Sequence, residues 1–152
     1  MKKKKVFIVD DDRDFISATS TILESNPYKC VSATSAEEAL DRVIDEDPDL
    51  IILDIMMEHI TAGFSVVNKL RSPGSNSPYS DCSGIPILAV TNIQEILDTD
   101  FSKIAGTKLF PVDGYLEKPL SADTLLENVN RLTGTIAVED FLKRARNPAE
   151  EA

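Results

Sequence analysis

The sequence predicts a three-layer α/β fold built around a five-stranded parallel sheet. Short apolar runs alternate about five times with segments of helical periodicity, which is the pattern of repeated strand-helix units. The runs in the sheet centre lack alternating polar residues, as expected of parallel strands that are buried on both faces. Several of them also end directly at an acidic, hydroxyl or amine side chain.

The first half of the chain contains three predicted strands and two predicted helices. The strands cover Val6–Val9, Tyr28–Ala33 and Leu50–Leu53, and the helices cover Asp14–Ser25 and residues 35–44. Apolar side chains recur at helical spacing in the first helix, which Asn26-Pro27 ends. Ser35 is a favourable N-cap for the second helix, and Glu38 completes a capping-box pattern.

The second half repeats this pattern with longer connections. Helices are predicted over Phe64–Leu70 and from the N-cap Ser121 to Leu132, and strands over Ile85–Val90 and Gly114–Lys118. Residues 72–84 contain two Pro, two Gly and five Ser, which predicts a loop. Residues 92–110 have the pattern of a weak helix followed by an irregular crossover.

Right-handed crossovers place helices on both faces of such a sheet. We expect the flavodoxin-like strand order 2-1-3-4-5, in which the first and third strands are neighbours at the switch point. A chain of 152 residues is expected to form one domain, over residues 1–134. Residues 135–152 are predicted to be a C-terminal extension, with a short helix over 136–146 and a disordered tail.

The composition is that of a soluble globular protein, with 42% hydrophobic and 28% charged residues. A formal net charge of -10 argues against direct binding to nucleic acid or to anionic membranes. The apolar runs are too short for a signal peptide or a membrane span, so we expect a cytoplasmic protein without membrane insertion. Cys30 and Cys82 form no metal-binding motif, and the single histidine, His59, excludes a histidine-based zinc cage.

Polar side chains capable of phosphoryl chemistry stand at the ends of four predicted strands. They are Asp10, Asp11 and Asp12 after the first strand, Asp54 after the third, Thr91 after the fourth and Lys118 in the fifth. Because parallel strands end at one sheet edge, these groups are expected to converge. Clustered carboxylates repel one another unless a cation neutralises them, and magnesium accepts carboxylate, water and phosphate oxygens as ligands.

The sequence therefore predicts a site for a divalent metal and a phosphoryl group. Asp54 would be the nucleophile, as aspartate is in enzymes that form an aspartyl phosphate. The hydroxyl of Thr91 and the ammonium of Lys118 would donate to phosphoryl oxygens. Asp12 is explained equally well as the N-cap of the following helix.

Four motifs, in this order, resemble the receiver domain of two-component response regulators. They are VDDD at 9–12, LIILDIMM at 50–57, LAVTN at 88–92 and GYLEKPL at 114–120. The resemblance covers Lys4 to Leu132 and implies the CheY-like form of the flavodoxin-like fold.

The resemblance also implies the role of each site residue. Asp54 is the expected phosphoacceptor, and Asp10, Asp11, Asp54 and the backbone carbonyl of Met56 are the expected ligands of Mg²⁺ or Mn²⁺. Thr91 and Lys118 are expected to contact the phosphoryl group, and Tyr115 to act with Thr91 as the conformational switch. The Lys118-Pro119 peptide bond is expected to be cis.

By the same resemblance, the chain is a single-domain response regulator, a phosphoprotein of phosphorelay signal transduction. Its phosphoryl donor would be a sensor histidine kinase or a phosphotransfer protein. Since no output domain fits in the short stretch after Leu132, output is expected through contact with a downstream protein target or through phosphorelay. It would not be an enzyme beyond its own phosphorylation and dephosphorylation, and a homodimer is compatible with this interpretation.

The chain departs from the family pattern at several positions. Residues 58–63 lack the usual proline, residues 72–84 are a long loop, and Asn92 replaces a small residue. Met56 and Ile93, at positions that tune acyl phosphate hydrolysis in the family, are both apolar, which predicts slow self-dephosphorylation.

Two other functions stay open at this point. The altered segment 58–63 is compatible with a receiver-like interaction module that works without phosphorylation. A haloacid-dehalogenase-type phosphatase also begins with an apolar strand and an Asp-x-Asp motif, which Asp10 and Asp12 match. That family needs an acidic pair late in the chain, and none follows a predicted strand there.

Overall fold

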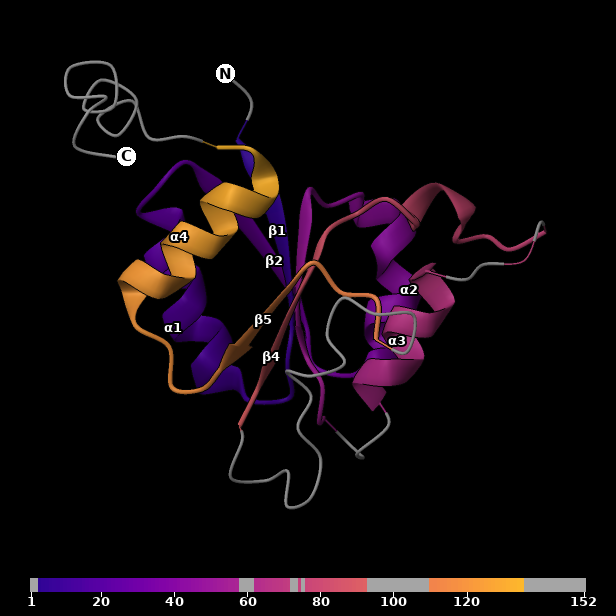
Figure 1. The fold of residues 1–152 in the computed structure, drawn as a ribbon, viewed down its shortest axis with the longest axis horizontal. Helices are drawn as coiled ribbons and strands as arrows, with labels where there is room; N and C mark the ends of the chain where they lie inside the picture. Colours follow the sequence, from indigo (N-terminus) through magenta and orange to yellow (C-terminus); the bar gives the residue numbers. More distant parts are fainter. Residues whose placement is uncertain (1–2, 58–61, 72–73, 75, 93–109, 136–152) are drawn as a thin grey trace, which may run out of the picture.

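The computed structural model describes residues 3–57, 62–71, 74, 76–92 and 110–135 (Figure 1). A sheet of five parallel strands in the order β2-β1-β3-β4-β5 runs through the centre. Its strands are β1 (Lys4–Val9), β2 (Tyr28–Ala33), β3 (Leu50–Asp54), β4 (Ile87–Thr91) and β5 (Gly114–Glu117). The predicted fold class and strand order are confirmed.

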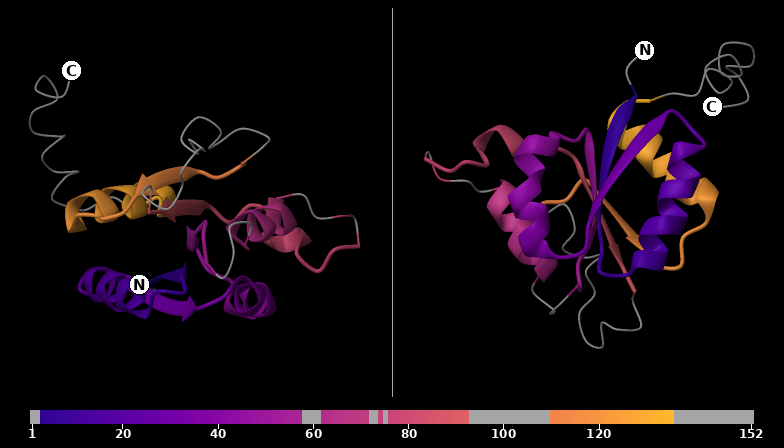
Figure 2. Two further views of the ribbon diagram at one scale, coloured as in Figure 1. Left: turned by 90° about the horizontal axis from the view of Figure 1, so that it is seen from below. Right: turned by 180° about the vertical axis from the view of Figure 1, so that it is seen from behind.

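Helices cover both faces of this sheet. Helices α1 (Arg13–Glu24) and α4 (Ala122–Thr133) pack on one face, and α2 (Ala36–Glu46) and α3 (Ala62–Arg71) on the other (Figures 1 and 2). This three-layer arrangement follows from right-handed crossovers between parallel strands. None of the described helices has the length and apolar character needed to span a lipid bilayer.

Each face of the sheet has its own hydrophobic cluster, because successive side chains of a strand point in opposite directions. Phe7 and Val9 of β1 pack with the apolar side chains of α2 and α3. Val6 and Ile8 of the same strand pack with those of α1 and α4. Burial on both faces explains why β1, β3 and β4 have continuous apolar sequences.

The predicted caps of α2 and α4 are confirmed. The hydroxyl of Ser35 accepts a hydrogen bond from the amide of Glu38 at 3.1 Å, and that of Ser121 accepts one from Thr124 at 3.1 Å. Gly134 follows α4 in the left-handed conformation, with φ of 72°, which favours glycine.

Several element boundaries differ from prediction. β1 begins at Lys4 rather than Val6, because backbone pairing with β2 continues through two lysines whose side chains need not be buried. Larger shifts place the start of α3 at Ala62, β4 at Ile87–Thr91 and the end of α2 at Glu46, and the other ends differ by at most one residue.

The predicted loop over residues 72–84 contains a short 3-10 helix, η1 (Ser80–Cys82). Beside it, the hydroxyl of Tyr79 donates to the carbonyl of Leu40 in α2 at 3.1 Å, and Cys82 is buried. The described part of this segment therefore packs on the domain. The weak helix and crossover predicted after Asn92, and the helix and tail predicted after residue 135, lie outside the described residues.

Candidate functional site

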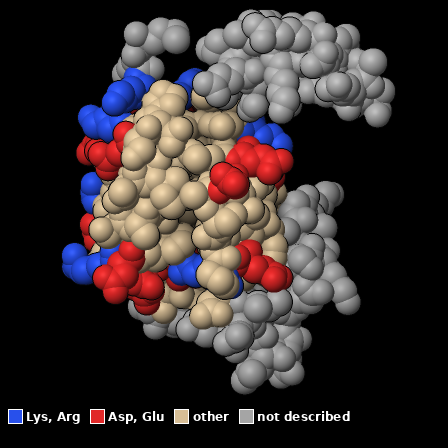
Figure 3. All heavy atoms as spheres, turned by 90° about the vertical axis from the view of Figure 1, so that its left-hand side faces the viewer, with Lys and Arg blue, Asp and Glu red and all other residues tan. Residues whose placement is uncertain are grey.

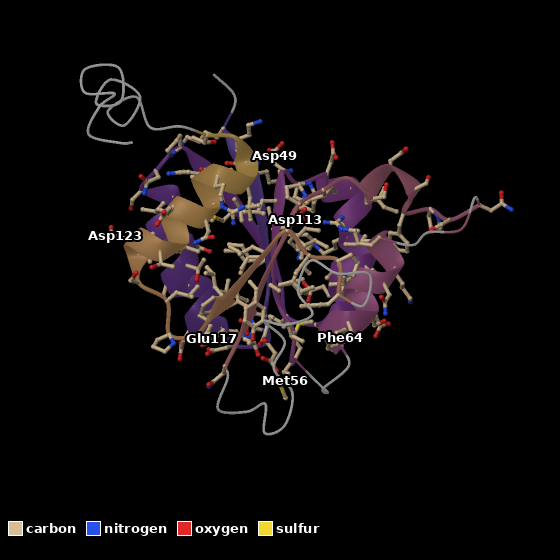
Figure 4. All side chains as sticks on the ribbon, viewed as in Figure 1. Asp49, Met56, Phe64, Asp113, Glu117 and Asp123 are labelled. Carbon is tan, nitrogen blue, oxygen red and sulfur yellow. The ribbon has the colours of Figure 1, made fainter. Side chains whose placement is uncertain are left out.

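The carboxyl ends of the central strands bring the predicted site residues to one edge of the sheet. Asp10 follows β1, Asp54 and Thr91 are the last residues of β3 and β4, and Lys118 follows β5. In Figure 4, Met56 and Glu117 lie at this edge, whereas Asp49 and Asp113 lie toward the opposite one. Strand topology alone therefore assembles a site from four separate parts of the chain.

Three carboxylates form the acidic part of the site. Asp10, Asp11 and Asp54 each offer an oxygen, and these oxygens lie within 4.8 Å of one another. Asp10 and Asp54 are only 1% and 6% exposed, whereas Asp11 is exposed to solvent. Hard oxygen ligands with one side open to water are the donor set that suits Mg²⁺, which keeps several waters when it binds protein.

The electrostatics of Asp54 support a cation at this position. Burial raises the pKa of Asp54, the negative charge of Asp10 raises it further, and the charge of Lys118 and the amide of Met56 lower it, with a result of about 7. The ionised carboxylate therefore lacks sufficient positive charge around it. A divalent cation among the three carboxylates would supply that charge, so the residues fit Mg²⁺ or Mn²⁺.

Lys118 supplies part of the missing positive charge. Its Nζ lies 2.7 Å from Oδ2 of Asp10 and 3.7 Å from Oδ2 of Asp54. Burial lowers the pKa of Lys118, but the hydrogen bond to Asp10 and the charges of nearby aspartates outweigh it, so the net change is upward. The ammonium is therefore charged and lies beside the predicted acceptor. The Lys118-Pro119 peptide bond is cis, as the resemblance implied.

Thr91 presents a buried polar group without a partner. The residue is fully buried, and its Oγ1 makes no hydrogen bond within the described part of the chain. Buried hydroxyls are normally paired, because an unpaired one costs free energy. The hydroxyl is therefore available to a ligand oxygen at this edge.

Met56 and Tyr115 lie next to these groups. The backbone amide of Met56 donates to Oδ1 of Asp54 at 3.1 Å, so the main chain of Met56 adjoins the acceptor carboxylate. Tyr115 is half-buried, pairs with Ala89 and packs on the cluster of α2 and α3. Since Ala89 and Thr91 are two residues apart in β4, the side chains of Tyr115 and Thr91 share a face of the sheet.

The carboxylate of Asp12 caps α1. Its Oδ1 accepts hydrogen bonds from the amides of Asp14 at 3.0 Å and Phe15 at 3.3 Å. Of the two explanations for Asp12, the geometry favours the N-cap. Ile93 and His59 lie outside the described residues, as do 58–61.

Two further residues at the site were not singled out from the sequence. The amide of Gly63 donates to the carbonyl of Ile55 at 2.9 Å, and a Cβ at Gly63 would lie 2.4 Å from Cα of Ile55. The glycine just before Phe64 was the available signal for this close approach. The ring of Phe15 lies 4.2 Å from Nζ of Lys118, but helical spacing marked Phe15 only as a core residue.

The amino-acid sequence is similar to those of known response regulators. The sequence matches the family described as response regulator receiver domain over residues 6–130. It is 33% identical over 118 residues to the alkaline phosphatase synthesis transcriptional regulatory protein PhoP of Bacillus subtilis, which covers 78% of this chain and 43% of PhoP. It is 30% identical over 136 residues to response regulator MprA of Mycolicibacterium vanbaalenii, covering 90% of this chain and 53% of MprA. The chain thus spans about half the length of these curated relatives.

Solved structures show the same fold. The receiver domain of Francisella response regulator 1452 superposes with a TM-score of 0.69 at 30% identity, covering 87% of this chain and 98% of that one. Chemotaxis response regulator CheY4 of Vibrio cholerae has a TM-score of 0.69 at 28% identity, covering 86% and 98%. The matched range, residues 6–130, contains all the site residues discussed above.

Proposed function

This chain belongs to the response regulator receiver domain family of two-component systems, and on that premise we propose that it accepts a phosphoryl group on Asp54. The observation that carries the proposal is the surroundings of this one buried carboxylate. Asp10 and Asp11 lie within 4.8 Å, and the ammonium of Lys118 lies 3.7 Å away. The hydroxyl of Thr91, which has no hydrogen-bond partner among the described residues, ends the neighbouring strand.

The acidic cluster is proposed to hold Mg²⁺ or Mn²⁺. Asp10, Asp11 and Asp54 would provide carboxylate oxygens, and Met56 its backbone carbonyl. The bound ion would neutralise the carboxylates and the charge of the phosphoryl oxygens.

The residues of the chain have distinct parts in the transfer. An oxygen of ionised Asp54 forms a bond to phosphorus while the bond between phosphorus and the donor breaks, and the electron pair of that bond leaves with the donor. Lys118 and Thr91 donate hydrogen bonds to the phosphoryl oxygens, the former as a point charge. The product is an acyl phosphate on Asp54, so the chain catalyses only its own phosphorylation and dephosphorylation.

The proposed partners follow from this chemistry. The donor is a sensor histidine kinase or a phosphotransfer protein, and the output is contact with a downstream protein or onward transfer of the phosphoryl group. The shared sheet face of Tyr115 and Thr91 supports their proposed role as a switch. Apolar Met56 and Ile93 do not orient an attacking water, so the acyl phosphate is expected to be long-lived, and a half-life of seconds in magnesium would contradict this.

The two other functions are less well supported. A haloacid-dehalogenase-type phosphatase would need Asp12 beside Asp10 in its active site. Here the carboxylate of Asp12 instead accepts hydrogen bonds from the first backbone amides of α1. A receiver-like module that works without phosphorylation has no need of a largely buried ammonium beside the acceptor, or of a buried hydroxyl that has no partner within the described structure.

The test is intact-mass analysis after incubation with acetyl phosphate and magnesium. We expect addition of one phosphate, which is lost in Asp54→Asn and in the presence of a chelator. Asp41→Asn, which changes an exposed aspartate of α2, should be labelled like the wild type. Absence of label in the wild type would contradict the proposal and favour the module that works without phosphorylation, whose partner binding Asp54→Asn would leave unchanged.

A further inference from the structure

Among the described residues, three groups lie close to the ammonium of Lys118, and one of them is aromatic. Its Nζ lies 2.7 Å from Asp10, 3.7 Å from Asp54 and 4.2 Å from the centroid of the Phe15 ring. The Lys118 side chain is only 17% exposed, so water supplies little of its solvation. A cation over an aromatic face is attracted by the ring quadrupole, and more strongly where water is excluded.

The main chain at Phe15 is held by the acidic loop after β1. The amide of Phe15 donates to Oδ1 of Asp12, and the amide of Asp12 donates to Oδ1 of Asp10 at 2.9 Å. The other oxygen of Asp10 accepts from Lys118. Asp10, Asp12, Phe15 and Lys118 therefore form a closed set of contacts that joins the start of α1 to the site.

The structure leaves open space beside Lys118. A cavity of about 520 Å³ opens beside it on the face formed by α1 and α4, and Asp12 and Asp14 are among its lining residues. Figure 3 shows this face, where uncharged side chains fill the centre and charged ones lie around the margin. An ammonium that turned toward Asp14 would leave the carboxylate of Asp54.

We propose that Phe15 is a positioning residue for Lys118, whose ring keeps the ammonium beside Asp54 and out of this cavity. The inference rests on the proposed function, in which Lys118 contacts a phosphoryl group on Asp54. A cation bound by Asp10 would weaken the attraction between Asp10 and Lys118, since the carboxylate charge is then shared. A cation bound by Asp10 does not weaken the attraction between the Phe15 ring and the ammonium. The ring therefore contributes a larger part of what holds Lys118 in place once the cation is bound.

Stepwise fluorination of the ring tests this proposal, because fluorine weakens the negative potential of the ring face with little change of shape. We would place 4-fluoro-, 3,5-difluoro- and 3,4,5-trifluorophenylalanine at position 15 of the full chain. The rate of phosphate addition from acetyl phosphate should fall with each fluorine, by about fivefold for the last, which corresponds to about 1 kcal/mol.

Substitutions by standard amino acids separate the effect of the aromatic ring from the effect of side-chain volume. Phe15→Tyr keeps an electron-rich ring and should react at close to the wild-type rate, whereas Phe15→Leu fills similar space and should be at least as slow as the trifluoro variant. Ile22→Val is the matched control, because Ile22 lines the same cavity from the same helix and should leave the rate unchanged.

A second readout does not depend on phosphorylation. The NMR signals of the Lys118 ε-methylene protons should be shifted upfield by the ring in the wild type and in Phe15→Tyr, and should lose that shift in Phe15→Leu. Equal rates across the fluorinated series, or unshifted Lys118 signals in the wild type, would overturn the proposal. A wild-type protein that takes no phosphate but shows the shift would instead contradict the proposed function and leave the Phe15–Lys118 contact supported.

Discussion

The backbone amide of Lys118 donates a hydrogen bond to the carbonyl of Thr91 at 2.7 Å. This bond extends the pairing of β4 with β5, in which Thr91 lies beside Glu117, by one residue. The hydroxyl and the ammonium proposed to contact one phosphoryl group are therefore joined through the main chain. Their relative position should survive changes to either side chain, so single substitutions should report on chemistry rather than on the strand arrangement.

Thr91→Val should not destabilise the unphosphorylated protein. Since Oγ1 of Thr91 has no hydrogen-bond partner in the described structure, the free energy of unfolding should be unchanged or higher by up to about 1 kcal/mol. Urea denaturation would measure this. Thr133→Val is the control, because the hydroxyl of Thr133 donates to Val129 at 2.8 Å and its loss should destabilise. An equal loss of stability in both variants would show that Thr91 is paired.

Lys118→Met should destabilise the metal-free protein strongly at pH 8. The substitution leaves the buried side chain of Asp10 without its cationic partner, and breaking a buried ion pair costs about 3 kcal/mol. Lys69→Met, at an exposed position in α3, should change the free energy of unfolding by no more than about 0.5 kcal/mol. Similar values for the two variants in urea denaturation would be evidence that the Lys118 ion pair does not stabilise the fold.

The stability of the metal-free protein should depend on the ionisation of Asp54. The pKa of Asp54 is about 7 in the folded protein, against an ordinary value of 3.8. Between these pH values the folded state binds more protons at this residue than the unfolded state, so this contribution to the free energy of unfolding falls as pH rises. The free energy of unfolding of Asp54→Asn, relative to that of the wild type, should therefore rise from about pH 4 to about pH 7, by on the order of 4 kcal/mol, and then remain level.

Urea denaturation in a chelator across this pH range would measure the difference between Asp54→Asn and the wild type. Asp41→Asn should follow the wild type throughout, since Asp41 is exposed on α2. Magnesium should stabilise the wild type at pH 8 and stabilise Asp54→Asn less, because ligand binding to the folded state adds to stability. A constant difference between the two proteins at all pH values would contradict the raised pKa.

Gly63→Ala should disturb both the fold and phosphorylation. An added Cβ would lie 2.4 Å from Cα and 2.6 Å from the carbonyl oxygen of Ile55, so backbone must move. Overpacking of this kind costs about 1–3 kcal/mol, and the displaced segment leads directly from Asp54. Gly84→Ala is the control, because a Cβ there would meet no atom within 4 Å. Thermal denaturation and the rate of phosphate addition should both separate the two variants.

Much of the fold could be predicted because its central strands β1, β3 and β4 are buried on both faces. Leu50–Leu53 and the other apolar runs stand out for that reason, and the alternation with helical segments restricts the sheet to a parallel one. The strand boundaries were less predictable. Lys4 belongs to β1 because its backbone pairs with β2, and its exposed polar side chain gives no sign of a strand in the sequence. The short helix at Ser80–Cys82 was also missed, because Pro, Gly and Ser indicate a turn without specifying its packing.

The sequence by itself determined that four of the site residues meet. Asp10, Asp54, Thr91 and Lys118 each stand at the end of a predicted strand, and parallel strands carry such residues to one edge. Only the tertiary structure decided how they interact. The ammonium of Lys118 bonds to Asp10 across 108 residues of chain and lies on the ring of Phe15. Distance, burial and charge arise between elements that are remote in sequence, so no local pattern records them.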